Sequence, residues 1–277
     1  MAVLLRSPEA QRQIEREGFV VVPLLDRELP GLNDLVADVQ ARLRTDPRWE
    51  PRGFDELMYV EDRALRRNIQ AELERALLPR LAEHVVDPHI LFSNILVKAP
   101  APARNVVPPH QDYCVVDESL GYAHVQVWVP LVDVARSNGC LGVVPRTHRV
   151  PNPYRAQGDT TAFEAFGDRL RGELMRWIPL RVGEAILFAG RTVHASDKNR
   201  SSRYRPSAGC FLVPPEAPLV HYHRRTATRV EVFRLEQEEL RDIMVGARPD
   251  VGRSAGVIDH APADVSYEEF QRLTSDR

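Results

Sequence analysis

Cysteine, long apolar runs and lysine are all scarce in this 277-residue sequence, and each shortage narrows what the protein can be. The three cysteines, Cys114, Cys140 and Cys210, are far apart and form no Cys-x-x-Cys spacing, which fits a reducing cytoplasm and argues against a disulfide framework. Apolar residues flank Cys114 and Cys210, so we expect buried thiols there. No stretch of about 18 apolar residues occurs, and the first residues lack the basic flank and hydrophobic core of a secretory signal. Neither a membrane span nor an export signal is predicted.

The chain also lacks an excess of charge of either sign. Its formal net charge is -2, which gives no electrostatic reason to expect nucleic acid or an anionic membrane as a partner. Only Lys98 and Lys198 are lysines among the 37 basic residues, and we interpret this preference for arginine as codon bias. The remaining composition, 43% apolar and 27% charged, describes an ordinary globular protein of one large domain or two small ones.

The first third of the chain has the pattern of one strand followed by two helices. Residues 17–25 (EGFVVVPLL) form a short apolar run typical of a strand, and apolar residues recur at helical spacing over 32–43. A second helix is predicted over residues 61–84, where Pro79 should kink or break it. Its apolar face would consist of five residues spaced four apart: Leu65, Ile69, Leu73, Leu77 and Leu81.

The pattern changes in the middle of the chain. Between Ile90 and Val213, short β-like runs such as ILFSNILVKAP and EAILFAG are separated by Pro, Gly and Asn, which indicates an antiparallel sandwich or barrel. The tail returns to helical patterns in VFRLEQEELRDIM and YEEFQRL. We therefore expect a mainly β protein with flanking α-helices, in a single domain over residues 1–277. Its parts would be N-terminal helical and strand elements (1–88), a β core (89–215) and a helical C-terminal extension (216–277).

His110 and Asp112, in the segment PPHQDYCVV, are the first candidate metal ligands. On an extended chain, residues i and i+2 point to the same side, so one nitrogen and one oxygen can reach a single ion. With nine histidines in the chain, about one His-x-Asp or His-x-Glu pair is expected by chance, so the pair alone is weak evidence.

His194 is the third candidate, at the far end of the β-like run in GEAILFAGRTVHAS. In a β-sandwich, a residue at the mouth of one strand can meet the start of a distant strand. One histidine, one carboxylate and a distal histidine make up the facial triad that leaves open positions on Fe(II), whereas zinc more often recruits a further His or Cys. The alternative for His194 alone is a half-buried histidine with its hydrogen bonds satisfied. His221 and His223 form another possible metal pair, but no acidic residue is near them in sequence, which favours an exposed or substrate-facing role.

Arg205 and Ser207 follow His194 in HASDKNRSSRYRPSAGCFLVP. If strand alternation holds, the two side chains point to the same side, and an arginine fork beside a hydroxyl is suited to hold a carboxylate. The alternative is a surface arginine on a strand edge, which is our interpretation of Arg200 and Arg203.

Taken together, these residues resemble the phytanoyl-CoA dioxygenase family of Fe(II)/2-oxoglutarate oxygenases. EGFVVVPLLDREL resembles the opening segment of the family, and SNGCLGVVPRTHR resembles its Asn-Gly-(Ala/Cys)-Leu run and the turn that follows. The resemblance spans about residues 16–213 and rests on four features of this sequence: His110-x-Asp112, Trp128, His194 and Arg205-x-Ser207.

The resemblance implies a double-stranded β-helix, the jelly roll of cupin-like proteins, with helices packed outside it. His110, Asp112 and His194 would hold Fe(II), and 2-oxoglutarate would chelate the iron while its distal carboxylate lies on Arg205 and Ser207. With O2 as the oxidant, the co-substrate would leave as succinate and CO2 and an unactivated substrate carbon would be hydroxylated. Members of the family that halogenate have Gly or Ala where Asp112 stands, so this carboxylate argues against halogenation.

One turn departs from the family pattern. In PRTH, Arg146 stands where glycine is usual, and a non-glycine residue disfavours the positive-φ conformation that glycine permits.

Strand periodicity predicts further contacts. In YAHVQVWVPL, Tyr122, His124, Gln126 and Trp128 share one face, while the valines share the other and should pack under the helices. If Trp128 faces the co-substrate, Gln126 and His124 face it too. We predict that Gln126 and Trp128 contact the co-substrate or substrate, and that His124 lines the cavity without binding iron. The alternative for His124 and Gln126 is a solvated face.

Three weaker candidates complete the predicted site. Ser196, two residues after His194, is placed with the groups that bind the co-substrate. The alternation of ILFSNILVK allows Asn94 to reach the cavity, and Tyr113 would line it or pack beside it. The long polar segment 151–171 is a candidate lid.

Three functions remain open. The leading one is a hydroxylase of a small molecule, in a cytoplasmic monomer or homodimer, and the arginine-rich chain suggests bacterial specialised biosynthesis. The second keeps the same cofactors but ends in desaturation, cyclisation or epimerisation. The third is a non-catalytic jelly-roll protein that binds or senses a small molecule. The complete triad and the Arg205/Ser207 pair argue against the third, because a binding module needs neither.

Overall fold

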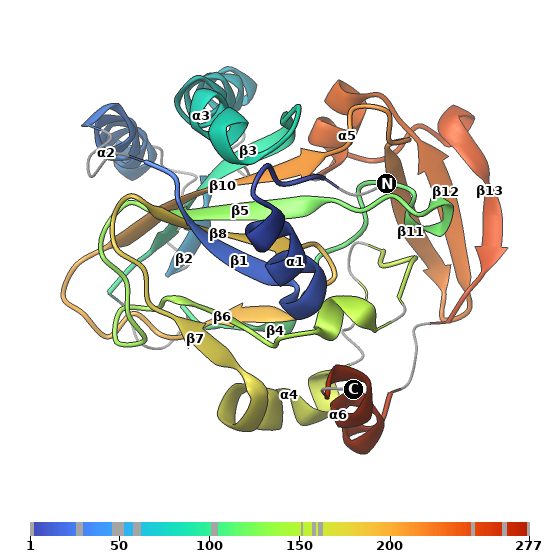
Figure 1. Ribbon diagram of the computed structural model, residues 1–277. Coiled ribbons are helices and arrows are strands. Elements are labelled where there is room, and N and C mark those ends of the chain that lie inside the picture. Colours follow the sequence, from blue (N-terminus) through green and yellow to red (C-terminus); the bar gives the residue numbers. More distant parts are fainter. Residues whose placement is uncertain are drawn as a thin grey trace.

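The described residues form three antiparallel sheets, two at the centre of the molecule and one, from the tail of the chain, at its edge (Figure 1). The structure is a computed structural model and describes residues 3–25, 30–45, 53–57, 62–100, 105–150, 152–156, 159, 163–244, 247–261 and 265–275. Within these residues, no helix has both the length and the apolar character required to cross a bilayer.

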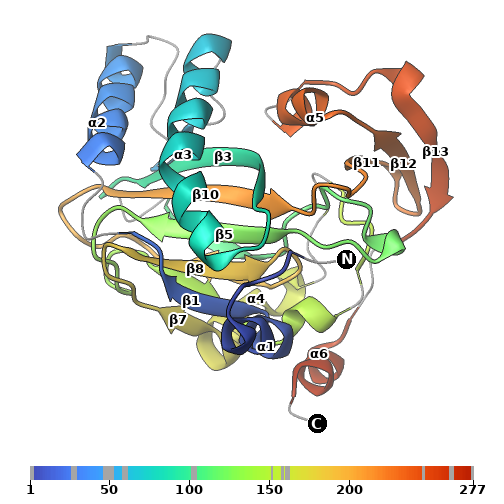
Figure 2. The same ribbon diagram turned by 45° about the horizontal axis from the view of Figure 1, so that its top comes forward.

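Two of the sheets build the predicted jelly roll. The larger sheet has, in spatial order, β1 (Phe19–Pro23), β8 (Glu184–Ala189), β5 (Val125–Pro130), β10 (Arg205–Val213), β3 (His89–Lys98) and β2 (Phe54–Glu56). The smaller sheet has β4 (Val107–His110), β9 (His194–Ser196), β6 (Leu141–Val143) and β7 (Arg176–Ile178). In both views the smaller sheet lies on one side of the larger one, and helices cover the opposite side (Figures 1 and 2). The expectation of a mainly β jelly roll with flanking helices is confirmed.

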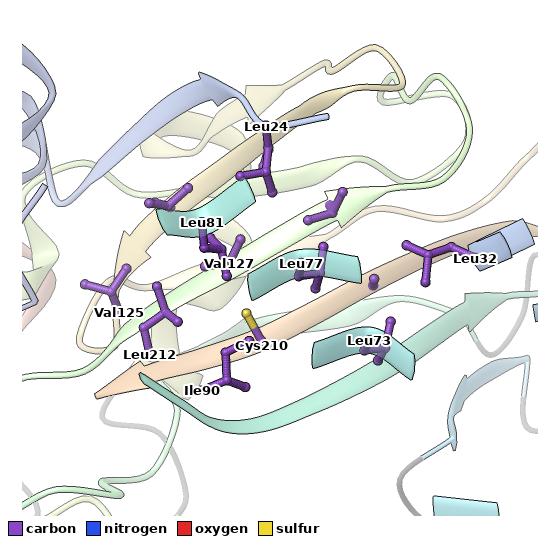
Figure 3. Packing of buried hydrophobic residues seen from close by; sticks show 14 of the residues in the cluster. Leu24, Leu32, Leu73, Leu77, Leu81, Ile90, Val125, Val127, Cys210 and Leu212 are labelled. Atoms are coloured by element: carbon purple, nitrogen blue, oxygen red, sulfur yellow. The ribbon is translucent and has the colours of Figure 1, made fainter. Parts of the chain in front are cut away.

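The main hydrophobic core lies between the larger sheet and α3 (Arg63–His84), with α2 (Pro30–Thr45) beside it (Figure 2). All five predicted residues of the α3 stripe are buried, and Leu73, Leu77 and Leu81 have no exposed surface. They pack over side chains of β5 and β10, including Val127 and Cys210 (Figure 3). Burying one such leucine contributes about 1.5–3 kcal/mol to the free energy of folding. The stripe therefore holds α3 against the larger sheet.

The helix α3 continues past Pro79 to His84, so the expectation of a break there is wrong. The carboxylate of Asp62 begins the helix by accepting hydrogen bonds from the main-chain N–H groups of Ala64 and Leu65. Pro79 lies on the exposed side, where a carbonyl left without its N–H donor can be hydrated.

Strand β5 alternates as predicted. Val125, Val127 and Val129 point to the core under α3, while Gln126 and Trp128 point the other way, into the space between the sheets. The face of this strand could be read from the sequence because valine recurs at every second position.

The tail differs from the expected helical extension. The helices α5 (Gln237–Met244) and α6 (Tyr267–Thr274) lie where helical patterns predicted them. The tail also forms a third sheet of β11 (Val220–Thr226), β12 (Arg229–Arg234) and β13 (Ser254–Asp259), which was not expected. Its middle strand, RVEVFR, carries a period-two pattern, and its last residues belong to this strand and not to the helix that VFRLEQEELRDIM predicts.

Arg146 adopts the conformation that was not expected of it, with a φ of 69°. Its main-chain N–H donates to the carbonyl oxygen of Glu17 at 2.8 Å, and its guanidinium lies 3.3 Å from the Glu17 carboxylate. These contacts to α1 (Pro8–Glu17) offset the cost of a left-handed conformation without glycine.

Candidate active site

The two predicted histidine ligands are direct neighbours across a strand pair. Strands β4 and β9 are antiparallel, with the Cα of His110 opposite that of His194, and the two ring centroids lie 4.1 Å apart. The pairing places both imidazoles on one face of the smaller sheet, which explains how residues so far apart in sequence meet.

Asp112 completes the cluster from the chain just after β4. Its Oδ1 lies 3.6 Å from Nε2 of His110, and its Oδ2 lies 3.6 Å from Nε2 of His194. One ligand atom from each residue lies within 4.8 Å of the others, close enough to share one ion. Two imidazole nitrogens and one carboxylate on one side of an ion form the donor set of the Fe(II) facial triad.

Both imidazoles are held with Nε2 turned toward the cluster. Nδ1 of His110 donates to the carbonyl oxygen of Pro108 at 2.8 Å, and Nδ1 of His194 donates to that of Thr192 at 3.0 Å. The carbonyl can only accept, so the proton is on Nδ1 and the lone pair of Nε2 faces the cluster. Burial, with the charge of His110, lowers the pKa of His194 to about 4, so this ring is neutral near pH 7.

The carboxylate of Asp112 is ionised. Burial alone would raise its pKa, but the neighbouring rings of His194 and His110 hold the pKa well below its usual range. The cluster therefore offers one negative charge and two nitrogen lone pairs to a cation.

Arg205 is a buried cation without a counter-ion. It is the first residue of β10, is only 2% exposed, and its Nη1 donates to Oγ of Ser207 at 2.6 Å. Its Cζ lies 5.4 Å from the ring centroid of Trp128, and its Nε has no partner. Burial lowers its pKa to about 10. Among the described residues no carboxylate forms an ion pair with it, so the site is prepared for an anion from outside the chain.

The triad and Arg205 open onto one cavity of about 220 Å³ between the two sheets. Its wall includes five of the residues singled out from the sequence: Asn94, Tyr113, Gln126, Trp128 and Ser196. Ser207 is fully buried behind Arg205, and its hydroxyl donates to the carbonyl oxygen of Leu96 at 3.3 Å. The five wall residues face the cavity as expected, whereas Ser207 does not line it, and the roles of all six remain predictions.

His124 does not line the cavity, contrary to expectation. Its ring is fully buried and stacks on Phe211, with 5.4 Å between centroids and 24° between planes, and it is Phe211 that reaches the wall. A Cβ on Gly190 would lie 2.0 Å from Nε2 of His124, so the imidazole fills the space above this glycine. His124 lies just before β5 begins, which is why the strand alternation did not apply to it.

Glu56 also lines the cavity, although no sequence pattern indicates it. Burial, together with the charge of Asp112, raises its pKa to about 7. It belongs to the three-residue strand β2, too short for a period to be recognised, and it reaches the cavity only because β2 pairs with β3. His221 is buried in the tail sheet against Phe233, away from the cavity, and His223 is exposed.

Segment 151–171, the candidate lid, is described only in part, because residues 151, 157–158 and 160–162 lie outside the described residues. Phe163, Phe166 and Leu170 pack against Phe270 of α6. Movement of this segment stays a prediction.

Comparison with known families agrees with this geometry. The profile of a family described as phytanoyl-CoA dioxygenase (PhyH) matches residues 14–207, well over half of the chain. The chain belongs to the phytanoyl-CoA dioxygenase family. The matched range contains the whole triad and extends to Ser207.

Curated PhyH relatives match over shorter stretches. The peroxisomal phytanoyl-CoA dioxygenase of Bos taurus is 26% identical over 110 residues, which is 38% of this chain and 33% of the relative. Phytanoyl-CoA dioxygenase domain-containing protein 1 of Danio rerio is 30% identical over 128 residues, 44% of this chain and 43% of the relative. The chain thus aligns with less than half the length of these relatives.

Solved structures share the PhyH-type fold. The epimerase SnoN, in complex with Fe3+, alpha ketoglutarate and nogalamycin RO, has a TM-score of 0.55 at 22% identity, covering 92% of this chain and 94% of its own. The carbocyclase SnoK, from nogalamycin biosynthesis, has a TM-score of 0.54 at 20% identity, covering 77% and 86%. HygX from Streptomyces hygroscopicus, with nickel and 2-oxoglutarate bound, has a TM-score of 0.54 at 16% identity, covering 76% and 88%.

Proposed function

We propose that this PhyH-family protein is an Fe(II)- and 2-oxoglutarate-dependent dioxygenase that hydroxylates an unactivated carbon of a small molecule. The observation that carries the proposal is the pairing, in one cavity, of an open three-ligand cluster with the buried, uncompensated guanidinium of Arg205. A metal alone would need only the cluster. A dicarboxylate that binds the metal with one end needs the cluster for that end and the guanidinium of Arg205 for the other.

The residues fit the two groups. His110, Asp112 and His194 supply two imidazole nitrogens and one carboxylate, which suits Fe(II) and leaves positions open. The guanidinium of Arg205 matches a carboxylate, and the hydroxyl of Ser207 orients that guanidinium. Iron bound there would supply the activation of O2, and 2-oxoglutarate would supply two electrons by its conversion to succinate and CO2.

The protein itself contributes binding, orientation and exclusion of water. The carbonyl oxygens of Pro108 and Thr192 hold the imidazoles in place, and Trp128 covers Arg205. Gln126, Asn94, Tyr113 and Ser196 stand on the wall as contacts for the co-substrate or substrate.

The other residues that line the cavity indicate which class of substrate fits it. It is mostly apolar, with aromatic rings from Phe54, Phe92 and Phe211, and the carboxyl of Glu56 stands among them. A small, largely apolar molecule that carries a hydroxyl or amine group fits such a wall. We place the enzyme in the cytoplasm, as a monomer or homodimer, in specialised biosynthesis.

The proposal is tested by anaerobic loading with Fe(II), addition of 2-oxoglutarate and O2, and quantification of succinate. We expect succinate with the wild-type protein and none above background with His194→Ala, which removes one metal ligand. The matched control is His223→Ala, which removes an exposed histidine outside the cavity and should behave as wild type. A wild-type protein that binds no Fe(II) would refute the proposal and favour the non-catalytic binding function.

The same residues also support desaturation, cyclisation or epimerisation. The outcome depends on where the substrate carbon lies relative to the metal, and no residue of the wall selects among the outcomes. Mass analysis of the product decides: hydroxylation adds one oxygen atom, desaturation and cyclisation remove two hydrogen atoms, and epimerisation leaves the mass unchanged.

A further inference from the structure

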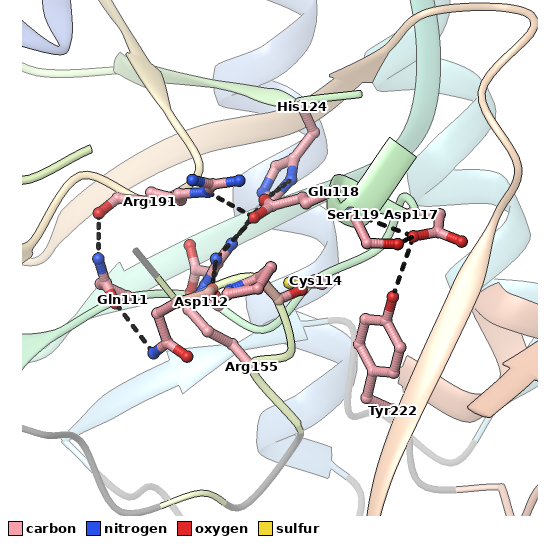
Figure 4. A network of polar contacts seen from close by, with 12 residues as sticks. Gln111, Asp112, Cys114, Asp117, Glu118, Ser119, His124, Arg155, Arg191 and Tyr222 are labelled. Atoms are coloured by element: carbon pink, nitrogen blue, oxygen red, sulfur yellow. Dashed lines mark hydrogen bonds and ion pairs between the residues drawn. The ribbon is translucent and has the colours of Figure 1, made fainter. Parts of the chain in front are cut away.

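Three charged side chains lie behind the metal-ligand segment, and none of them lines the cavity (Figure 4). Glu118 is 1% exposed, Arg155 is 4% exposed and Arg191 is 27% exposed. Arg155 donates to both carboxylate oxygens of Glu118, at 2.9 and 2.8 Å, and Nε of Arg191 donates to Oε2 of Glu118 at 2.6 Å. We refer to these three residues as the Glu118 cluster.

One arm of the Glu118 cluster holds the main chain around Asp112. Nε of Arg155 donates to the carbonyl oxygen of Asp112 at 2.5 Å, and the carbonyl oxygen of Arg155 accepts from the N–H of Cys114 at 3.0 Å. The ligand residue is therefore clamped on its carboxyl side by hydrogen bonds from one residue of a distant segment.

The other arm reaches the loop that leads to the third ligand. The carbonyl oxygen of Arg191, three residues before His194, accepts from Nε2 of Gln111 at 2.5 Å. Gln111 stands between the two ligands of the first segment, so the Glu118 cluster connects the chain of His110 and Asp112 with the chain of His194 (Figure 4).

We propose that the Glu118 cluster is a positioning device that fixes the main chain of Asp112 relative to His194 and so sets the metal affinity of the triad. Charge-assisted hydrogen bonds in a buried site are strong and directional, and groups that orient metal ligands influence affinity without touching the ion. The inference rests on the proposed function in one respect, that the triad binds Fe(II).

The same contacts link the metal site to segment 152–156, which carries Arg155. This segment also has an outer attachment: Arg224 of β11 donates to both oxygens of the Asp159 carboxylate, at 2.6 and 2.8 Å, and Asp159 accepts from the N–H of Ala156 at 3.0 Å. The outer pair has the same bidentate form as the inner pair but makes no contact with Asp112, so it provides a matched control.

The test is anaerobic titration of the full-length protein with Fe(II) alone, for Arg155→Gln, Arg155→Lys and the control Arg224→Gln. We expect Arg155→Gln to weaken Fe(II) binding by about 10- to 100-fold, the range found when groups that orient metal ligands are removed. Arg155→Lys keeps the charge but not the fork, so it should recover part of the affinity, and Arg224→Gln should bind as wild type. With Co(II) at saturation, the visible ligand-field spectrum should change in Arg155→Gln and not in Arg224→Gln.

Two results would overturn the inference: wild-type Fe(II) affinity in a folded Arg155→Gln variant, or an equal loss in Arg224→Gln. If Arg155→Gln does not fold, Arg191→Gln takes its place, because Arg191 is partly exposed and its loss leaves the pair of Arg155 and Glu118 intact. Unchanged affinity there would likewise count against the inference. Absence of Fe(II) binding in the wild-type protein is a separate outcome and refutes the proposed function itself.

Discussion

Replacing Arg205 by methionine is expected to stabilise the ligand-free protein and to remove its response to 2-oxoglutarate. Burial lowers the pKa of Arg205 to about 10, which corresponds to about 3 kcal/mol of lost stability of the charged form. Methionine has no charge to desolvate. It forfeits the hydrogen bond to Ser207, about 1 kcal/mol, and the contact with the ring of Trp128, also about 1 kcal/mol. The free energy of unfolding should therefore rise by about 1 kcal/mol.

The assay is thermal unfolding with and without 2-oxoglutarate, in the presence of Mn(II), which holds the co-substrate without turnover. A ligand at a concentration of 100 times its Kd stabilises a protein by about 2.7 kcal/mol, so the melting temperature of the wild type should rise on addition. Arg205→Met should start at a slightly higher melting temperature and not respond. Arg205→Lys keeps a buried charge without the fork, so it should show neither the gain in stability nor the full response. A clear destabilisation of ligand-free Arg205→Met, or a wild-type response to 2-oxoglutarate in that variant, would refute the reasoning.

Three further predictions concern residues of the core, the co-substrate site and the tail. Leu77→Ala removes a side chain with no exposed surface from the α3 stripe and should lower the free energy of unfolding by about 2–5 kcal/mol in urea denaturation; a loss below that range would mean that the helix repacks. Ser207→Ala leaves Nη1 of Arg205 without its partner and should raise the KM for 2-oxoglutarate about fivefold, the equivalent of about 1 kcal/mol, and an unchanged KM would remove Ser207 from the site. Burial and then the charge of His223 lower the pKa of His221 to about 4, below its ordinary 6.5, so the unfolded state takes up the proton first as pH falls. This contribution to stability, about 3 kcal/mol, is complete above pH 6.5 and lost as the pH falls towards 4. His221→Phe should lose less stability than wild type between pH 7 and pH 4, and equal losses would contradict the assignment.

The three candidate metal ligands could be predicted because their geometry is local or tied to a strand end. His110 ends β4 and Asp112 follows two residues later, so their short spacing was enough to place both at the same end of that strand. The prediction of His194 needed information from outside its own segment, because nothing there indicates which strand it faces. The resemblance to a family supplied that pairing. The register of β4 and β9 then places the two imidazoles opposite each other.

The residues that escaped prediction depend on long-range packing. Glu56 faces the cavity through the pairing of β2 with β3, and the chain near it carries no period that would reveal this. His124 was assigned from strand alternation, yet it lies one residue before the strand, where the chain direction is set by Gly190 and Phe211. The Glu118 cluster combines residues from three separate segments, and each of them alone reads as an ordinary surface charge.

The position of β10 has a consequence for the order in which the molecule is assembled. In the larger sheet β10 lies between β5 and β3, so it alone joins the part formed by β1, β8 and β5 to the part formed by β3 and β2. Residues 205–213, which form β10, leave the ribosome after every other strand of that sheet. A nascent chain that has exposed His110, Asp112 and His194 therefore still has two unjoined sheet fragments and no Arg205. The three ligands of the cluster therefore emerge before the strand that carries Arg205 and joins the two parts of the larger sheet, so Arg205 is the last of the four groups to be added to the cavity.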